Sequence, residues 1–146
     1  VAQVVRYDGP DAVDLGGKHK FPQCELVYAG TLRGAADVLA REAPAGLAIP
    51  YLHVMAGHDG TATAGRYGTA TAGRYGTATA GDRGIATAGE FGTATVGRDG
   101  TIILSYVDED ECPRIAVGRV GENGILPNVA YRLDADYNFV QCGAHP

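Results

Sequence analysis

Six consecutive octads over residues 56–103 constrain the fold of this chain more than any other feature. They read AGHDGTAT, AGRYGTAT, AGRYGTAT, AGDRGIAT, AGEFGTAT and VGRDGTII. Eight residues are too few to bury a core of their own, so such units must stack on similar neighbours. The period therefore predicts a β-solenoid, in which the backbone winds into stacked coils.

Each octad combines a turn with a strand. Glycines at its second and fifth positions bracket a variable pair, and glycine permits the positive φ angles that a tight turn requires. The Thr-Ala-Thr-Ala run that follows is typical of a strand, whose side chains alternate between two faces. If the alanines face inward, the β-branched threonines face outward onto a pleated surface. Two octads then close one flattened coil, so six octads give about three coils of sixteen residues.

The predicted interior is a column of methyl groups, which only a very thin solenoid could accommodate. The open ends of the column must be covered by larger side chains. The flanking segments are therefore expected to pack against the ends of the solenoid at Met55, Val96, Ile102 and Leu104. The column itself consists of Ala56, Ala62, Ala64, Ala70, Ala72, Ala78, Ala80, Ala86, Ala88 and Ala94, followed by Val96 and Ile102.

Stacking also places residues sixteen apart above one another, which turns the variable pairs into two columns. The first is expected to form an alternating-charge ladder that sets the register between coils. The second contains an exposed aromatic pair, Tyr75 above Phe91. The ladder comprises Arg66, Asp82 and Arg98, beside Tyr67, Arg83 and Asp99.

The two threonine faces differ. Ile85 and Ile103 interrupt one of them, which suggests that another segment partly covers that face. The other face is regular and is expected to stay open. It carries Thr61, Thr63, Thr77, Thr79, Thr93 and Thr95.

The octad A-G-x-x-G-T-A-T resembles half of the sixteen-residue coil of bacterial ice-nucleation proteins. That resemblance covers 48 of the 146 residues and implies a β-solenoid whose Thr-x-Thr rows organise water, here the six threonines of the regular face. The downstream stretch RIAVGRVGENGILPNVAYRLD resembles the end segment after short octad arrays in uncharacterised bacterial and phage proteins.

The flanking segments are expected to cap the array. Residues 1–55 predict an α/β cap, with strands at VAQVVRY and QCELVYAG, a Gly-rich loop or hairpin between them, and a helix from its Thr31 cap to about residue 43. The helix stripe is Leu32, Ala36, Leu39 and Ala43, with Pro44 beyond its end. Residues 104–146 predict an antiparallel β-meander of four strands, TIILSYV, RIAVGRV, VAYRL and NFVQC, with a tight turn at Asn123-Gly124. The fold class is mainly β.

Charge and cysteine content indicate the cellular compartment in which the chain is expected. The net charge is −5, and residues 104–146 hold seven acids against three bases. Cys24, Cys112 and Cys142 leave one thiol unpaired in any disulfide scheme, which favours a reducing compartment. With no apolar run long enough for a membrane and no export signal at its start, the chain is expected in the cytoplasm of a bacterial host cell.

The sequence indicates no catalytic, cofactor-binding or metal site. His19, His53, His58 and His145 are scattered without a metal-ligand spacing, and Ser105 lies in no nucleophile elbow. An enzyme with its site in residues 1–55 stays open as an alternative.

The favoured hypothesis is a non-enzymatic binding protein, an inhibitor of the phage or mobile-element kind. Its partner is expected to be a protein or protein–nucleic-acid complex with a basic surface, which the inhibitor covers. Direct nucleic-acid or membrane binding is not expected of an acidic chain. The alternative is a water-organising or ice-binding protein that uses the threonine face. Self-association through the aromatic column or the threonine face stays open as a further interaction. The partner-binding residues are expected to be Asp108, Glu109, Asp110, Glu111 and Glu122, with Tyr75 and Phe91, and with Asp134 and Asp136 if the fold brings them together.

Overall fold

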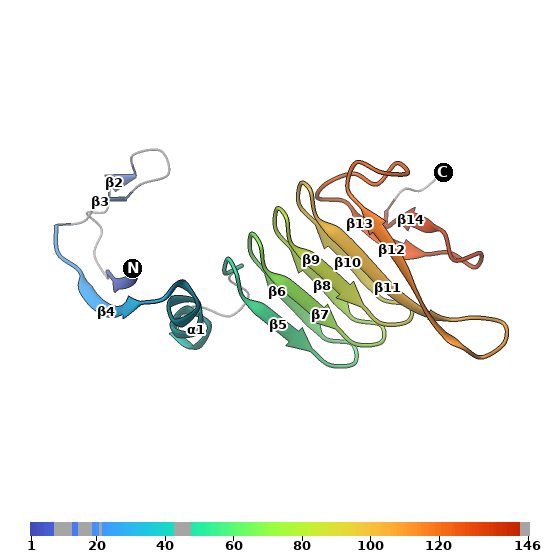
Figure 1. The fold of residues 1–146 in the computed structure, drawn as a ribbon, viewed down its shortest axis with the longest axis horizontal. Coiled ribbons are helices and arrows are strands. Elements are labelled where there is room, and N and C mark those ends of the chain that lie inside the picture. Colours follow the sequence, from blue (N-terminus) through green and yellow to red (C-terminus); the bar gives the residue numbers. More distant parts are fainter. Residues whose placement is uncertain (8–12, 15–18, 21, 43–47, 144–146) are drawn as a thin grey trace. The chain divides into compact units, whose positions relative to one another are not determined.

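The computed structural model describes residues 1–7, 13–14, 19–20, 22–42 and 48–143 (Figure 1). The chain divides into two compact units, Val1–Ala43 and Pro44–Pro146. The first is mixed α/β, and the second is a β-solenoid, as the octads predict.

The first unit pairs two antiparallel strands, β1 (Ala2–Arg6) and β4 (Glu25–Gly30), with helix α1 (Leu32–Glu42) packed against both. In the sequence between β1 and β4, strands β2 (Val13–Asp14) and β3 (His19–Lys20) pair with each other in antiparallel orientation. The predicted N-cap is confirmed, since Thr31 Oγ1 accepts a hydrogen bond from the amide of Gly34 at 3.1 Å.

The predicted apolar stripe of α1 is partly wrong. Leu32 is 52% exposed, and among the helix side chains that the structure describes, those of Ala35, Ala36 and Val38 are buried. Leu32 lies in the first turn, at the end of the helix, whereas the buried residues occupy its middle. Ala43 and Pro44 lie outside the described residues.

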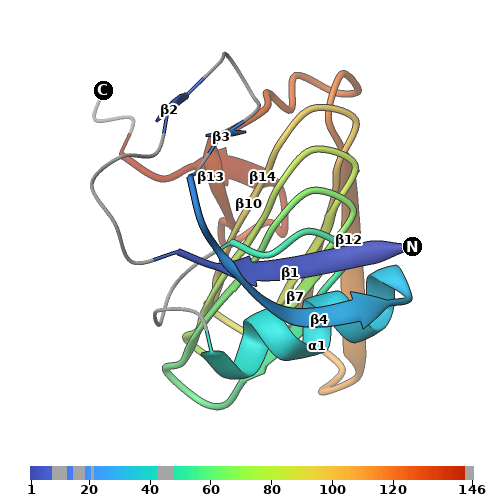
Figure 2. The ribbon, with the colours of Figure 1, turned by 90° about the vertical axis from the view of Figure 1, so that its left-hand side faces the viewer.

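The second unit winds through seven short strands that alternate between two parallel sheets (Figure 1). One sheet contains β5, β7, β9 and β11, and the other contains β6, β8 and β10. Seen along the stack in Figure 2, the sheets form two layers joined by turns. The strands are β5 (His53–Ala56), β6 (Thr61–Ala64), β7 (Thr69–Ala72), β8 (Thr77–Ala80), β9 (Ile85–Ala88), β10 (Thr93–Val96) and β11 (Thr101–Val107).

The inside-outside alternation and the sixteen-residue register are both confirmed. Ala62, Ala78 and Ala94 pair in register along one sheet, and each is 0% exposed. Val96, Ile102 and Leu104 are buried in the same cluster as the alanine column, at its C-terminal end. Met55 is 73% exposed, so its predicted place inside the stack is wrong.

The solenoid begins one octad earlier than the repeats suggest. Residues 48–55, AIPYLHVM, form the same turn and strand, although both octad glycines are replaced. Tyr51 has φ 61° and donates its amide to Arg66 O, as Asp59, one octad later, donates to Arg74 O. Met55 therefore occupies an octad position that faces outward, which explains its exposure.

The octad glycines serve close packing rather than positive φ. Among the described residues, positive φ in the repeat turns falls on the residue before the second glycine, for example 57° at Tyr75 and Phe91. A Cβ at Gly76 would lie 2.8 Å from Ala72 Cβ and 2.9 Å from Gly60 O of the neighbouring coil. Successive turns pack backbone against backbone, and this contact excludes side chains.

The C-terminal segment extends both sheets instead of forming one meander. Strand β12 (Pro113–Arg119) pairs with β11, while β13 (Ala130–Leu133) pairs with β10 and with β14 (Phe139–Gln141). All four predicted strands are present, but they divide between the sheets because the stretch after β12 crosses from one layer to the other. The Asn123-Gly124 turn lies in this crossing, with φ 47° and 78°.

Two side chains of this segment close the end of the alanine core. Ile125 and Tyr131 are 4% and 2% exposed and belong to the same buried cluster as the alanines. Tyr131 OH accepts a hydrogen bond from the amide of Leu126 at 2.9 Å. The polar end of this buried tyrosine is therefore satisfied.

Candidate functional site

In the first turn column, which contains Tyr67, Arg83 and Asp99, the side chains interact mainly with one another. Tyr51 stacks on Tyr67 with ring centroids 5.2 Å apart, and Arg83 donates to Tyr67 OH at 2.6 Å. Arg83 also pairs with Asp99 at 3.4 Å. The hydrogen bond from Arg83 lowers the pKa of Tyr67 below its ordinary value. The predicted alternating-charge ladder is present only in part. The ion pair joins Arg83 to Asp99, while Asp82 accepts the backbone amide of Arg98 at 2.9 Å and does not pair with Arg66.

The second turn column carries the predicted aromatic pair. Tyr75 stacks on Phe91 with ring centroids 5.2 Å apart and planes inclined by 15°. Arg74 lies over both rings, its Cζ 5.2 Å from the Tyr75 centroid and 5.5 Å from that of Phe91, and it pairs with Glu90 at 3.0 Å. Phe91 is nevertheless 71% exposed, so much of its surface faces solvent.

The column ends at Phe91 because the chain stops turning. In a further coil, residues 105–108 would form the next turn, but β11 continues straight to Val107 and pairs with β12. The acidic run follows as the loop of the β11–β12 hairpin. Val107, the last residue of β11, lines the same pocket as Phe91, so the loop begins beside the last aromatic turn.

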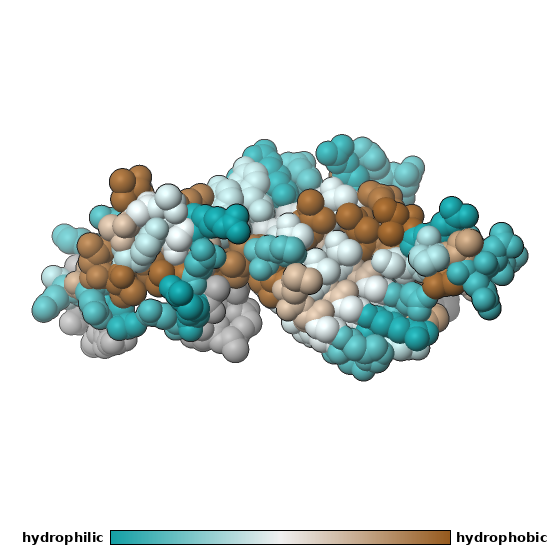
Figure 3. All heavy atoms as spheres, turned by 60° about the horizontal axis from the view of Figure 1, so that its bottom comes forward, coloured by the Kyte–Doolittle hydropathy of each residue, from teal (hydrophilic) through white to brown (hydrophobic). Residues whose placement is uncertain are grey.

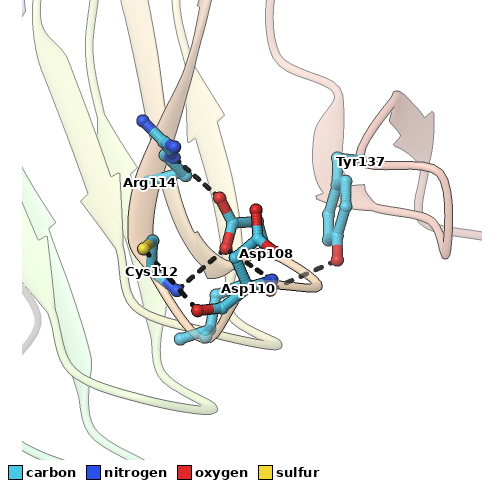
Figure 4. A network of polar contacts seen from close by, with 6 residues as sticks. Asp108, Asp110, Cys112, Arg114 and Tyr137 are labelled. Carbon is cyan, nitrogen blue, oxygen red and sulfur yellow. Dashed lines mark hydrogen bonds and ion pairs between the residues drawn. The ribbon is translucent and has the colours of Figure 1, made fainter.

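Asp108 holds this hairpin loop together (Figure 4). Its Oδ1 accepts the amides of Asp110 and Cys112 at 3.1 and 2.8 Å, and its Oδ2 accepts Arg114 Nε at 2.8 Å. Glu109, Asp110 and Glu111 are exposed on the same loop. The Asp108 carboxylate therefore stabilises the loop, whereas the side chains of Glu109, Asp110 and Glu111 are available to contact a partner.

The state of the β11–β12 loop is expected to depend on pH. The Arg114 guanidinium, followed by the amides of Cys112 and Asp110, lowers the pKa of Asp108 below its ordinary 3.8. Such a carboxyl stabilises the fold above its unfolded pKa, and that stabilisation is lost as pH falls through its folded pKa. We expect the carboxyl ¹³C resonance of Asp108 to titrate with a midpoint below 3.8, and Arg114→Gln to raise that midpoint. A midpoint at or above the ordinary value would contradict the ion pair.

The β13–β14 loop repeats the geometry of the acidic loop. Asp134 Oδ1 accepts the amides of Asp136 and Asn138 at 3.0 and 2.9 Å, just as Asp108 accepts from the second and fourth residues after it. The two loops lie side by side, because Tyr137 OH donates to Val107 O at 3.2 Å and Tyr137 stacks on Tyr106 at 4.2 Å. The shared D-x-D pattern is the sequence signal for this pair of loops.

A groove of about 190 Å³ opens between the last aromatic turn and these loops. Its polar lining includes the Arg74–Glu90 pair and Asp134. Its apolar lining comes from Phe91, Leu104, Tyr106, Leu133 and Tyr137. The groove joins residues that the sequence keeps far apart, and sequence reasoning missed Tyr106, Leu133 and Tyr137.

The fold separates one predicted partner residue from the others. Glu122 follows β12 at the end opposite the acidic loop, and seven strand residues span roughly 20 Å. Asp134 and Asp136, by contrast, are brought beside the acidic loop. We call this surface the aromatic–acidic edge; it consists of Tyr75, Phe91, Tyr106 and Tyr137 with Glu109, Asp110, Glu111, Asp134 and Asp136.

The threonine grid forms as expected on the sheet of β6, β8 and β10. Thr61, Thr77 and Thr93 pair in register, and so do Thr63, Thr79 and Thr95. The grid is not entirely open, since Cys142 Sγ lies 3.9 Å from Thr93 Oγ1. Cys24, Cys112 and Cys142 are free thiols.

The interrupted face is more apolar than the threonine grid. Ile85, Ile115 and Val117 are 39%, 62% and 60% exposed, and β12 continues this sheet at its edge instead of crossing its face. The view in Figure 3 shows hydrophobic residues gathered over the C-terminal coils. The expected covering of Ile85 is therefore not provided by the C-terminal strands.

Comparison with protein-family models, curated proteins and solved structures found no match to this chain. Within the described part of the chain, no helix combines the length and apolar character needed to cross a membrane. Function must accordingly be argued from the surfaces themselves.

Proposed function

We propose that this chain is a non-enzymatic binding protein whose aromatic–acidic edge docks onto a basic protein surface and occludes it. The partner we infer is a protein that normally holds nucleic acid, because a basic nucleic-acid groove complements exposed acids. This is the action of a phage or mobile-element inhibitor. Electrostatic attraction of this kind steers association and selects the partner.

One observation carries the proposal, the apolar groove beside the exposed acids. Interfaces draw their affinity from aromatic anchors in pockets, and surrounding charges add steering and specificity. The edge supplies both, since Phe91 is 71% exposed at the groove and Glu109, Asp110 and Glu111 lie on the adjoining loop. The stacked solenoid offers a rigid support for these loops.

Replacing Glu109, Asp110 and Glu111 by serine should weaken capture of the partner while leaving the melting temperature nearly unchanged. Asp108 is retained because it holds the loop. The experiment is a pull-down from nuclease-treated bacterial lysate, with the captured proteins identified by mass spectrometry. We expect basic nucleic-acid-binding proteins that are released by added duplex DNA and by salt, since salt screens exposed charges.

A charge-matched control removes three other exposed acids, Asp59, Asp99 and Glu122, and should capture as the wild type does. If the loop variant captures the same proteins as this control, or if added DNA releases nothing, the proposal is wrong. Self-association would appear in the same experiment as capture of a tagged second copy.

The registered threonine grid favours a second candidate, a water-organising surface. Its three rows of Thr-x-Thr anchor few waters, so we expect thermal hysteresis close to that of buffer. Ice-growth microscopy measures this directly. A large hysteresis that Thr77→Tyr abolishes would favour the water-organising function over partner binding.

A further inference from the structure

Among the residues that the structure describes, Phe91 is the last ring of its stack, and no ring stacks on it from the side opposite Tyr75. Tyr75 covers one face of Phe91, and the groove opens beside Phe91 where a further coil would have placed its turn. Tyr106, Leu133 and Tyr137 line the groove without continuing the stack. A planar group that enters the groove can therefore lie on Phe91 at the stacking distance that Tyr75 keeps, 5.2 Å.

The chain's own arginines show which planar group these turn rings accept. Arg66 Cζ lies 5.0 Å from the Tyr67 centroid, and Arg83 Cζ lies 5.7 Å from the same ring. Arg74 lies over Tyr75 and Phe91 in the same way. Guanidinium groups are attracted to aromatic faces, and they stack because they are planar.

The charges around the groove favour a cation. Arg74 is paired with Glu90 at 3.0 Å, so these two groups neutralise each other. Asp134 uses Oδ1 to hold its loop, and in the described part of the chain no cationic side chain pairs with its carboxylate. Asp136 and the three exposed acids of the neighbouring loop add negative charge.

The size of the groove restricts what it can hold. Its volume of about 190 Å³ is below the roughly 300–1,000 Å³ of sites for small molecules and cofactors. It suits one side chain better than a separate ligand. This limit, the ring face and the carboxylate together specify the chemistry of the occupant.

We propose that the groove takes a single arginine side chain of the partner, whose guanidinium stacks on Phe91 and pairs with the Asp134 carboxylate. The inference rests on the proposed function and specifies the residue that the edge recognises. Lysine fits less well, because its ammonium is a strongly hydrated point charge that cannot stack on the Phe91 ring face.

The test is an NMR titration of the full chain with N-acetyl-arginine methylamide, followed through the ring resonances of Phe91, Tyr106 and Tyr137. Saturable shifts are expected at millimolar concentrations. The lysine analogue should bind about threefold to tenfold more weakly, and the neutral citrulline analogue should not saturate. Equal responses to arginine and citrulline would overturn the inference.

Two substitutions locate the site. Phe91→Leu removes the ring face, and Asp134→Asn removes the charge while keeping an oxygen for the loop amides. Each should abolish the preference for arginine without altering the remaining amide spectrum. The matched controls are Tyr67→Leu and Asp99→Asn in the opposite turn column, which should bind as the wild type does. Unchanged binding by Phe91→Leu would also overturn the inference.

The outcomes separate this inference from the proposed function. If the lysate pull-down depends on Glu109, Asp110 and Glu111 but the arginine analogue shows no preference, only the arginine site is wrong. If capture does not depend on those acids, the proposed function fails whatever the titration shows.

Discussion

Gly73→Ala should destabilise the solenoid by at least about 2 kcal/mol, because the added methyl group has no room between coils. A Cβ at Gly73 would lie 2.8 Å from Gly57 C, 2.9 Å from Gly57 O and 2.9 Å from His58 N. These are backbone atoms of the neighbouring coil, so a rotamer change cannot relieve the clash. Denaturant unfolding of the full chain measures the loss.

Gly57→Ala is the matched control. Gly57 occupies the same octad position in the same turn column, one coil earlier, but a Cβ there meets nothing within 4 Å. Its φ is not positive, so alanine fits the backbone conformation at this position. Gly57→Ala should leave the stability unchanged or raise it by about 0.4–1 kcal/mol, because alanine reduces the conformational entropy of the unfolded chain. Equal losses for the two variants would show that the coils are not stacked in this register.

Ala78→Leu should cost about 1–3 kcal/mol or more, because it overfills a core built from methyl groups. Ala78 is 0% exposed and pairs with Ala62 and Ala94 in the strands on either side. Three further heavy atoms at this position must push the two sheets apart. The midpoint of thermal unfolding should fall accordingly.

The comparison for Ala78→Leu is Thr77→Ser, one residue away on the outer face. Thr77 is only partly buried, and serine keeps the hydroxyl group, so its effect should be small. A small loss for Ala78→Leu that matches the loss for Thr77→Ser would reverse the assignment of inside and outside.

The regular part of the solenoid was predictable because its period determines which residues stack and which face they take. Ala62, Ala78 and Ala94 are in register without reference to anything outside the repeat. The extra octad at residues 48–55 was missed because Ile49 and Leu52 replace its glycines. Tyr51 and Val54 match Tyr67 and Ala70 sixteen residues later, which is the signal that could have revealed it.

The role of the glycines was harder to predict from the sequence. Glycine beside a turn suggests positive φ, but in the repeat turns the positive φ falls on the residue before the second glycine, for example Tyr67, Tyr75 and Phe91 with φ of 57° each. A left-handed conformation disfavours residues with a Cβ, and ring stacking within the columns can offset part of that loss. Only the spacing of successive turns shows that glycine is needed for close approach.

The candidate site depends on contacts that no local pattern contains. Phe91 and the acidic run were identifiable as an exposed ring and a cluster of charge. Their neighbours Tyr106 and Tyr137 come together only because β11 and β13 extend different sheets and bring their loops side by side. Asp108 was grouped with the other acids because the sequence cannot show that its carboxylate holds the loop.

The alternation of octads between two sheets limits how this chain can change in length. Removing one octad would move every later strand to the opposite layer, so that β12 and β13 would each meet the wrong partner. Removing or adding sixteen residues leaves every later strand in its own layer. We therefore expect insertions and deletions in the array only as whole coils, and a whole-coil change alters the length of the turn columns while β12 and β13 keep their layers and partners.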